Sequence, residues 1–447
     1  MIIVLLRWAN ARASIRGTSN RYRLSRSFFY INANEVSPEA CFIMKKVLLF
    51  MLGTILSFPA FARDFSYEYK GKTIYYTVID EEAKTCKTTQ NPNSTTWGLT
   101  SGDVEIPSKV TDGNEIYKVI AIGASTFYRC SNLTSVTLPE GITSIDYSAF
   151  NQCSSLNSII IPNGVTSIGG EALWGCENLA SVILPEGLTS IGNNVFLGCK
   201  KLVSINIPET VTSIGQAAFY GCNSLSSVNI PDGITSIDWA TFRGCNGLSS
   251  ITIPESVTKI GSEAFGYCSN LTSINIPGRI TKISDGTFQG CSNLSYISIP
   301  EGVTSIGNNA FQGCSGLTSI YIPEGITSIG DEAFSECGAL NSVYYFADRP
   351  IEGNANIFSA ETYENAILYM SEDGVIFSSI REPWKNFKKI VESDKSGIDG
   401  IEADFDENAP CVVYSISGVK VGDSLDGLAS GIYIVRQGNK TTKISVK

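Results

Sequence analysis

A cysteine recurs every 23 residues between Cys130 and Cys337, and this spacing constrains the fold more than any other feature of the chain. The series holds ten of the thirteen cysteines: Cys130, Cys153, Cys176, Cys199, Cys222, Cys245, Cys268, Cys291, Cys314 and Cys337. A constant period of this length is typical of a solenoid, in which each repeat forms one coil and neighbouring coils bury each other's apolar sides.

Each 23-residue unit predicts one short strand that is followed by a turn. Leu133, Val136 and Leu138 have the spacing L-x-x-L-x-L, which is the strand pattern of leucine-rich repeats. Pro139 should end the strand because proline cannot donate a hydrogen bond to a β ladder. Nine successive units carry a proline at this place, up to Pro323. The residues left over are mostly small and polar, which suits the tight turns of a short coil.

The rest of the unit places the cysteine inside the coil. Ile145, Ala149 and Cys153 follow one another at intervals of four residues, which favours a short helical turn that closes the coil. We interpret the cysteines as buried free thiols that act as small apolar side chains. Disulfides and metal binding are the alternatives, because strands stacked about 4.8 Å apart fall within the Cα separation of a disulfide. Equivalent side chains of stacked coils point in parallel, however, so their Cβ atoms do not converge.

Changes in the pattern divide the rest of the chain. Residues 63–100 predict two short strands with a turn, and 104–130 show the repeat with an insertion, as expected of a solenoid end. The runs 412–416, 431–436 and 442–446 predict a separate β module. The expected segments are an N-terminal cap with the first atypical repeat at 63–129, the repeat array at 130–346, a C-terminal cap at 347–392, a linker at 393–409 and the small β domain at 410–447.

The N-terminal part predicts export. Met44 is followed by two lysines, an apolar run from Val47 to Leu56, and Ala60-Phe61-Ala62. This order is that of a secretory signal peptide, which we place at 44–62. Residues 1–43 would then be an upstream, non-native extension. The alternative is a genuine N-terminal extension with an internal apolar helix, but its apolar run is too short to span a bilayer, and no other stretch predicts a transmembrane segment.

The charge of the chain excludes several kinds of function. Lys and Arg number 33, Asp and Glu 43, and the net charge is −10. Without residues 1–62 the chain would carry 25 basic and 41 acidic residues, a balance that argues against nucleic acid or an anionic membrane as partner. The chain has no histidine, so it lacks the commonest general base and a common metal ligand. We therefore expect no enzyme activity, no catalytic residues, no metal and no cofactor.

One face of the predicted strands could bind a ligand. The outward residues form a column that is apolar at Ile160 and Ile183, rich in amides in the middle, and aromatic towards its end. Tyrosine suits binding because it offers contact area and a polar tip at low entropic cost. The alternative is that the isoleucines are ordinary strand formers and the tyrosines cover the end of the stack. The candidate ligand-binding residues are Asn206, Asn229, Thr252, Asn275, Tyr296, Tyr321 and Tyr344.

Two segments resemble known families. The unit I-P-E-G-V-T-S-I-G-x-x-A-F-x-G-C-x-x-L-T-S-I, at residues 299–320, resembles the BspA-like class of bacterial leucine-rich repeats, and the likeness extends over about residues 101–392. It differs from the better-known repeat, where Asn or Cys stands four residues after the third leucine, because Ile142 occupies that place. The tail, with Gly418-Val419-Lys420 and Ala429 to Arg436, resembles the C-terminal sorting domain of the type IX (Por) secretion system.

These resemblances set the functional expectation. The first implies a secreted or surface-exposed protein, and some relatives act as adhesins toward host matrix proteins or other cells. The second implies export through the outer membrane of a Bacteroidetes-type cell, with the tail read by the secretion machinery. We therefore expect a capped leucine-rich repeat solenoid that acts as a non-enzymatic protein-binding or adhesion module at the cell surface. The alternatives are a structural spacer without a dedicated ligand and a polysaccharide-binding protein.

Overall fold

The computed structural model describes residues 63–92, 98 and 100–393, together with four strand segments at 412–415, 420–422, 431–437 and 440–446. The expected extension at 1–43, the signal peptide at 44–62 and all but the first residue of the linker lie outside the described residues.

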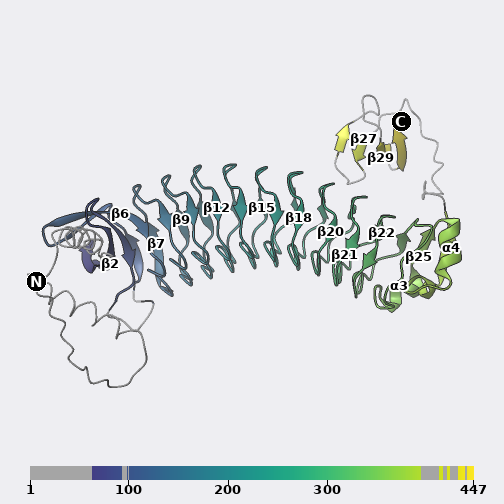
Figure 1. The fold of residues 1–447 in the computed structure, drawn as a ribbon, viewed down its shortest axis with the longest axis horizontal. Helices are drawn as coiled ribbons and strands as arrows, with labels where there is room; N and C mark the ends of the chain where they lie inside the picture. The colour runs from purple at the N-terminus through teal and green to yellow at the C-terminus, as the bar shows by residue number, and fades with distance from the viewer. Residues whose placement is uncertain are drawn as a thin grey trace, which may run out of the picture. The chain divides into compact units, whose positions relative to one another are not determined.

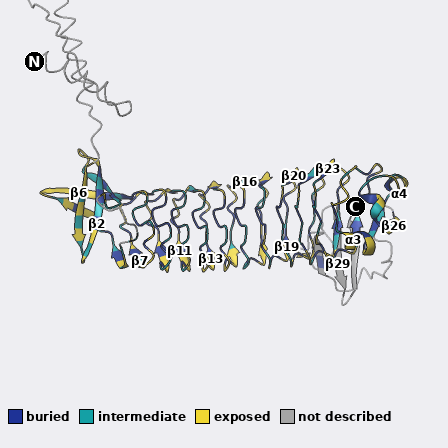
Figure 2. Ribbon diagram, turned by 90° about the horizontal axis from the view of Figure 1, so that it is seen from below, coloured by how far each residue is buried: buried dark blue, intermediate teal, exposed yellow. Residues whose placement is uncertain are grey.

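The repeat array is a β-solenoid, as the 23-residue period predicts, and its coils stack in one row (Figure 1). Most coils contribute short parallel strands to two ladders, and the coil with Tyr296 has no strand in the first. The register repeats by one period: Ser158 lies opposite Ser181 in the first ladder and Ser144 opposite Ser167 in the second. Figure 2 shows the two ladders along opposite edges of the array, with β7, β11, β13 and β19 on one side and β16, β20 and β23 on the other.

The first ladder is the strand that the sequence predicts. It consists of β7 (Leu133–Thr137), β9 (Ser158–Ile160), β11 (Ser181–Ile183), β13 (Ser204–Ile205), β15 (Ser227–Val228), β17 (Ser250–Ile251), β19 (Ser273–Ile274), β22 (Ser319–Tyr321) and β24 (Ser342–Tyr344). Alternate residues face the core, as Ile159 does between the exposed Ser158 and Ile160. From β7 to β22, a proline follows each strand two residues or fewer after the outward column and ends it, whereas β24 has Phe346 at that place.

The second ladder was not predicted. It consists of two-residue strands: β8 (Ser144–Ile145), β10 (Ser167–Ile168), β12 (Ser190–Ile191), β14 (Ser213–Ile214), β16 (Ser236–Ile237), β18 (Lys259–Ile260), β20 (Lys282–Ile283), β21 (Ser305–Ile306) and β23 (Ser328–Ile329). In each, the isoleucine is buried and the residue before it faces solvent or is half-buried. A strand of this length carries no alternation that a sequence could show.

The short helical turn predicted to close each coil is a run of turns, which does not extend into a regular helix. The backbone N–H of Ser148, Phe150 and Gln152 donates to the carbonyls of Gly170, Ala172 and Trp174 in the next coil, at 2.6–2.9 Å. A helix would direct these groups along its own axis. Ser148 and Gln152 have φ of 53° and 60°, and this conformation alternates the peptide directions so that every second N–H reaches the neighbouring coil.

The interior forms one continuous hydrophobic core from the N-terminal cap to the C-terminal cap. A column of phenylalanines runs along it from Phe196 to Phe358, with neighbouring ring centroids 5.2–5.9 Å apart and planes within 18° of parallel. The cysteine column lies three residues further along each coil and is buried, as predicted. Each coil alone could not bury these side chains, so the stack folds through contacts between neighbours.

The N-terminal cap contains more strands than the two expected at 63–100. They are β1 (Asp64–Tyr69), β2 (Lys72–Asp80), β3 (Thr85–Thr89), β4 (Gly102–Glu105), β5 (Lys109–Asp112) and β6 (Glu115–Ile122). β1, β2 and β3 pair antiparallel, and β3 pairs parallel with β6. β6 in turn pairs parallel with β8, the first strand of the second ladder. β4 pairs with β7, so the sequence before Cys130 forms an atypical coil of the first ladder.

The C-terminal cap extends the first ladder. It contains α3 (Ala360–Asn365), β25 (Ile367–Met370), α4 (Glu372–Ser378), the 3₁₀ helix η1 (Trp384–Asn386) and β26 (Lys389–Glu392). β25 pairs parallel with β24, and β26 pairs parallel with β25. Trp384 is fully buried and stacks on Tyr345 with ring centroids 4.7 Å apart. The cap therefore covers the core with aromatic side chains while the strand pairing continues.

The C-terminal module is a four-stranded antiparallel sheet in the order β28-β27-β29-β30. Its strands are β27 (Val412–Ser415), β28 (Lys420–Gly422), β29 (Gly431–Gln437) and β30 (Lys440–Val446). The three predicted β runs correspond to β27, β29 and β30, and β28 is an addition.

Candidate functional site

The outward face of the first ladder changes character along the array, as the sequence predicts. Ile160 and Ile183 are paired in β9 and β11 and remain 62% and 54% exposed. Asn206 and Thr252 are also exposed. Farther along the array the face becomes aromatic, so an apolar part, a polar part and an aromatic part follow one another along the same ladder.

Two of the predicted site residues form bonds that hold the ladder together. The amide of Asn229 accepts from the backbone N–H of Ile207 at 2.8 Å and donates to its carbonyl at 2.7 Å. Asn275 makes the same pair of bonds with Ile253, at 3.0 and 2.9 Å. In other coils a backbone carbonyl accepts the equivalent N–H bond, as that of Ile183 does from Ile161. Asn229 and Asn275 therefore complete the ladder, and much of their hydrogen-bonding capacity is used there.

The structure brings the predicted tyrosines together with two aromatic residues that sequence reasoning missed. Tyr321, Tyr344 and Tyr369 lie side by side on β22, β24 and β25. The rings of Tyr344 and Tyr369 stack with centroids 4.7 Å apart and planes 12° from parallel. Phe346 is buried beside them, with its centroid 6.2 Å from that of Tyr321 and 6.4 Å from that of Tyr344. We call the outward Tyr296, Tyr321, Tyr344 and Tyr369 the tyrosine end.

Tyr296 also belongs to the tyrosine end, although it lies two residues earlier in its coil than Tyr321 does in the next coil. It stands where most coils carry serine, one coil before Tyr321, and is 38% exposed. Burial raises the pKa of its hydroxyl. Burial also raises the pKa of Tyr344. These rings are half-embedded in the ladder with one side facing out, so they offer a rigid aromatic surface that needs little ordering on binding.

Carboxylates lie next to the tyrosine end. Burial, the charges of Glu301 and Glu324 and a hydrogen bond to Glu301 raise the pKa of Tyr321 to about 12. Both glutamates directly follow the proline that ends the strand, and both are exposed. The same place carries an exposed acidic residue in five other coils, and we call the whole set the acidic row: Glu140, Glu186, Glu209, Asp232, Glu255, Glu301 and Glu324.

Acidic residues on the closing turns serve the stack. Glu171 accepts from Ser148 and Asn151 in the preceding coil. Asp285 accepts from the backbone N–H of Asn308 at 3.0 Å. Such bonds join one coil to the next and explain the acidic residues without catalysis. In the part of the chain that the structure describes, no group of three or more cysteine and acidic side chains is placed to hold a metal ion.

Aromatic residues on the turn side form a separate cluster around Arg243. Its guanidinium lies 5.7 Å from the ring centroid of Tyr220 and 4.7 Å from that of Tyr267, and it forms an ion pair with Glu263. Trp239, three residues after Ser236 of β16, is 45% exposed. The cation is thus already held by this chain's own rings and carboxylate, which leaves the cluster a structural role.

The cysteine thiols are hydrogen-bond donors as well as core filling. Nine of them, from Cys153 to Cys337, donate through Sγ to a backbone carbonyl of the preceding coil at 3.1–3.3 Å. Burial raises the pKa of Cys176 to about 12. The eleven described cysteines are free and buried, and a protonated thiol in an apolar site is unreactive.

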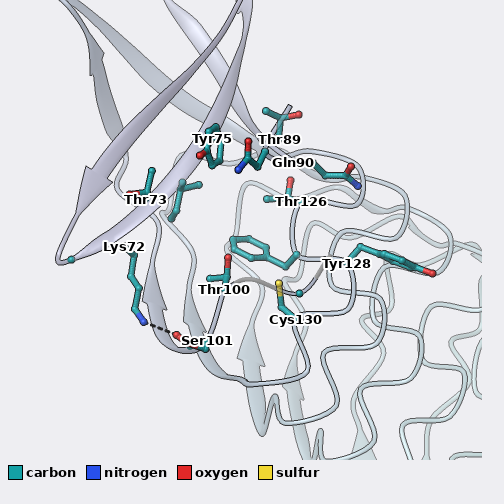
Figure 3. Close-up of a pocket in the computed structure, with 15 residues that line it drawn as sticks. Lys72, Thr73, Tyr75, Thr89, Gln90, Thr100, Ser101, Thr126, Tyr128 and Cys130 are labelled. Atoms are coloured by element: carbon teal, nitrogen blue, oxygen red, sulfur yellow. Dashed lines mark hydrogen bonds between the residues drawn. The ribbon is translucent and has the colours of Figure 1, made fainter. Parts of the chain in front are cut away.

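The N-terminal cap contains a cavity of about 360 Å³ between β2 and the first coil (Figure 3). Lys72, Tyr75, Thr126 and Cys130 are among its lining residues. Lys72 Nζ donates to the carbonyl of Ser101 at 2.6 Å, which ties the two walls together. Asn91 and Gly98 also line it, and residues 93–97, which lie between these two in the chain, are outside the described residues.

No helix in the described ranges has the length and apolar character needed to cross a membrane.

Comparison with known proteins identifies the repeats. Residues 120–249 and 235–362 match the family described as "BspA type Leucine rich repeat region" in six copies. None of the curated proteins matches the chain.

Several solved structures are similar to the chain. A leucine-rich cell surface protein of Faecalibacterium prausnitzii A2-165 is 28% identical over 63% of this chain and 94% of its own, with a TM-score of 0.38. A leucine-rich repeat protein of Bacteroides ovatus ATCC 8483 is 26% identical over 62% of this chain and 94% of its own, with a TM-score of 0.39. The pneumococcal vaccine antigen PcpA is 16% identical over 74% of this chain and 98% of its own, with a TM-score of 0.48.

The family match covers the coils whose strands, prolines and cysteines repeat by 23 residues, and it confirms the first of the two resemblances seen in the sequence. The matched residues make up more than half of the chain, and the chain therefore belongs to the BspA-type leucine-rich repeat family.

Proposed function

We propose that this protein is an exported, non-enzymatic surface module that binds a protein ligand through the tyrosine end of the first ladder. The observation that carries the proposal is the cluster of Tyr321, Tyr344 and Tyr369 on neighbouring strands of the outward face. Exposed aromatic clusters of this kind supply much of the binding energy in protein interfaces.

The rest of the array supports a binding role. Its regular coils present an extended surface, which suits a macromolecule better than a small substrate. The family is one of bacterial leucine-rich repeat proteins, and a relative with a solved structure is named as a cell surface protein. Acidic residues on the turns, such as Glu171 and Asp285, accept hydrogen bonds from a neighbouring coil, which gives them a structural role.

The test compares two double variants of the full chain. Tyr296→Ser with Tyr321→Ser removes aromatic area from the tyrosine end, and Ile160→Ser with Ile183→Ser removes comparable apolar area from the other part of the same ladder. Each protein is offered to a panel of purified matrix proteins, mucins and glycans and to whole bacterial cells. We expect a saturable protein ligand whose capture falls about tenfold or more in the tyrosine variant and changes little in the isoleucine variant.

Thermal unfolding of both variants is the control for folding. Equal capture by the tyrosine variant and the unaltered protein would refute the proposal. An absence of saturable binding across the panel would favour the structural spacer. Saturable binding confined to glycans would favour the polysaccharide-binding alternative.

We also propose that the C-terminal module directs export by a type IX route to the cell surface. The support is the tail's sequence resemblance and the compact sheet of β27 to β30, joined to the array through residues 394–411. Deletion of residues 410–447 in the native host should leave the protein inside the cell envelope, as measured by surface labelling and fractionation. Undiminished surface display of the deleted form would contradict this route.

A further inference from the structure

We infer that the tyrosine end binds a cationic side chain, an arginine or lysine of a basic polypeptide segment, between its rings and the carboxylates of Glu301 and Glu324. This inference rests on the proposed function and adds the chemistry of the partner to it. It follows from the rings, the neighbouring carboxylates and the charge of the whole array.

The rings form a platform rather than a set of separate side chains. Tyr344 and Tyr369 stack with their planes 12° apart, and the buried Phe346 lies against Tyr321 and Tyr344. All three tyrosines are half-buried, so each has one exposed part. The face of an aromatic ring carries negative potential and attracts a cation placed above it. Arginine suits such a platform best because its planar guanidinium stacks on rings.

Carboxylates flank this platform at the end of the strand. Glu324 lies three residues after Tyr321, and Glu301 occupies the same place one coil earlier. The charges of both glutamates also raise the pKa of Tyr321. The two glutamates occupy the same place in successive coils, so a group on Tyr321 would lie within reach of both. A guanidinium that stacks on a ring keeps its N–H groups in the plane, where they can donate to a carboxylate at the edge.

The charge of the array extends the attraction beyond the site. The acidic row places seven exposed carboxylates along one edge of the first ladder. Residues 133–345 contain 16 acidic and 6 basic residues. Of the basic six, Arg243 is already paired with Glu263, and Lys200 with Glu177. A strongly negative surface steers basic partners and repels acidic ones. Charge complementarity thus favours a basic polypeptide over a neutral glycan, although tyrosine rings alone could stack on either.

The experiment measures binding of defined peptides to the full chain by fluorescence anisotropy. The probes are a labelled decapeptide of alternating arginine and glycine, its lysine version, and a version in which citrulline replaces each arginine with nearly the same shape and no charge. We expect the arginine peptide to bind, the lysine peptide to bind more weakly, and the citrulline peptide to bind at least about tenfold more weakly than the arginine peptide. Binding should weaken between 50 and 200 mM NaCl.

Matched variants separate the site from the general field. Glu301→Gln with Glu324→Gln should weaken binding of the arginine peptide about tenfold. Glu186→Gln with Glu209→Gln removes the same charge at the same place in coils whose strand face carries no tyrosine. This pair should change the affinity for the arginine peptide by about twofold or less. Tyr344→Leu keeps apolar area but removes the ring's negative face, and should weaken binding about fivefold.

Several outcomes would overturn the inference: equal binding of the citrulline peptide, equal loss in the two glutamine pairs, or binding of glycan probes without the arginine peptide. The proposed function is tested separately by its own panel. If the tyrosine double variant loses its protein ligand while Glu301→Gln with Glu324→Gln keeps it, the tyrosine end binds protein but does not select a cation. If neither pair affects the ligand, both proposals fail.

Discussion

Replacement of Cys245 by alanine and by serine tests whether the cysteine column contributes hydrogen bonds or only fills space. Cys245 is fully buried, and its Sγ donates to the carbonyl of Phe219 at 3.2 Å. That carbonyl also accepts from the backbone N–H of Cys222 at 3.1 Å, so it keeps one partner when the thiol is removed. Cys245→Ala therefore loses the buried sulfur and leaves a small cavity.

The expected loss for alanine is about 2 kcal/mol, from roughly 0.8 kcal/mol for each buried methylene-sized group plus the cavity and a weak hydrogen bond. The serine variant distinguishes a hydrogen-bonding thiol from one that only fills space. In a purely apolar site its hydroxyl would be unpaired and would cost about 1–3 kcal/mol more than alanine. With the carbonyl of Phe219 as acceptor, the hydroxyl can donate as the thiol does. We therefore expect Cys245→Ser to be no less stable than Cys245→Ala.

Urea unfolding followed by circular dichroism at pH 7 gives the midpoint and slope for each variant. The comparison uses variants with equal slopes, because a repeat array can unfold in parts. A serine variant less stable than the alanine variant by more than about 1 kcal/mol would refute the hydrogen-bonding role, since it would place the hydroxyl in a site without an acceptor.

Three further predictions follow. Burial raises the pKa of the core thiols from 9.0 to about 12 at Cys176 and Cys268. Protonated thiols are thus the native form, and their contribution to stability is complete below pH 9 and lost as the pH rises toward 12, by about 1.4 kcal/mol per thiol and pH unit. Urea midpoints that stay level from pH 8 to 10.5 would contradict this. Asn229→Ala should lower the free energy of unfolding by about 1–2 kcal/mol, because the backbone N–H and carbonyl of Ile207 lose their partner. Asn206 is exposed, and Asn206→Ala should lower it by less than about 0.5 kcal/mol. Equal unfolding midpoints of the two variants would argue against a stabilising role of the bonds between Asn229 and Ile207. Phe242→Ala should cost about 3–5 kcal/mol, since its ring is buried between neighbours at 5.4 and 5.6 Å, and a shift below 1 kcal/mol would show that the column collapses around the gap.

The sequence predicted the solenoid because one residue type marks each coil. The cysteine period sets the register, the prolines mark the ends of the first ladder, and the break after Cys337 marks the C-terminal cap. The cysteine recurs ten times and the proline nine times, so a single exception to a repeated requirement, such as Leu173 in the phenylalanine column, does not hide the period.

Features that depend on backbone conformation or on distant pairing were missed. The interval from Ile145 to Cys153 fits a helix and a run of turns equally well. The turns require positive φ at positions such as Glu171 and Asn194, and side chains there gave no sign of it. The second ladder was missed because its strands are two residues long. In the site, Asn206 and Asn229 look alike in sequence, and only the structure shows that one of them bonds to the backbone.

Tyr369 was missed for another reason. It lies beyond the end of the period, and a cap segment of irregular length separates it from Tyr344 in the chain. Only the pairing of β25 with β24 brings the two rings together. Nothing in the sequence from Ile367 to Met370 indicates the partner strand or its register.

The caps also decide how long the protein can become. A stack of near-identical coils carries no stop signal of its own, because each coil ends in the same unpaired groups that the next coil would bind. β26 ends the first ladder with Lys389 and Glu392 exposed, and charges at a strand edge discourage further pairing. A chain cut after Cys337 would present an open coil and join with other copies into fibres. Conversely, loss or gain of one 23-residue unit would shorten or lengthen the array by one coil while both caps still fit.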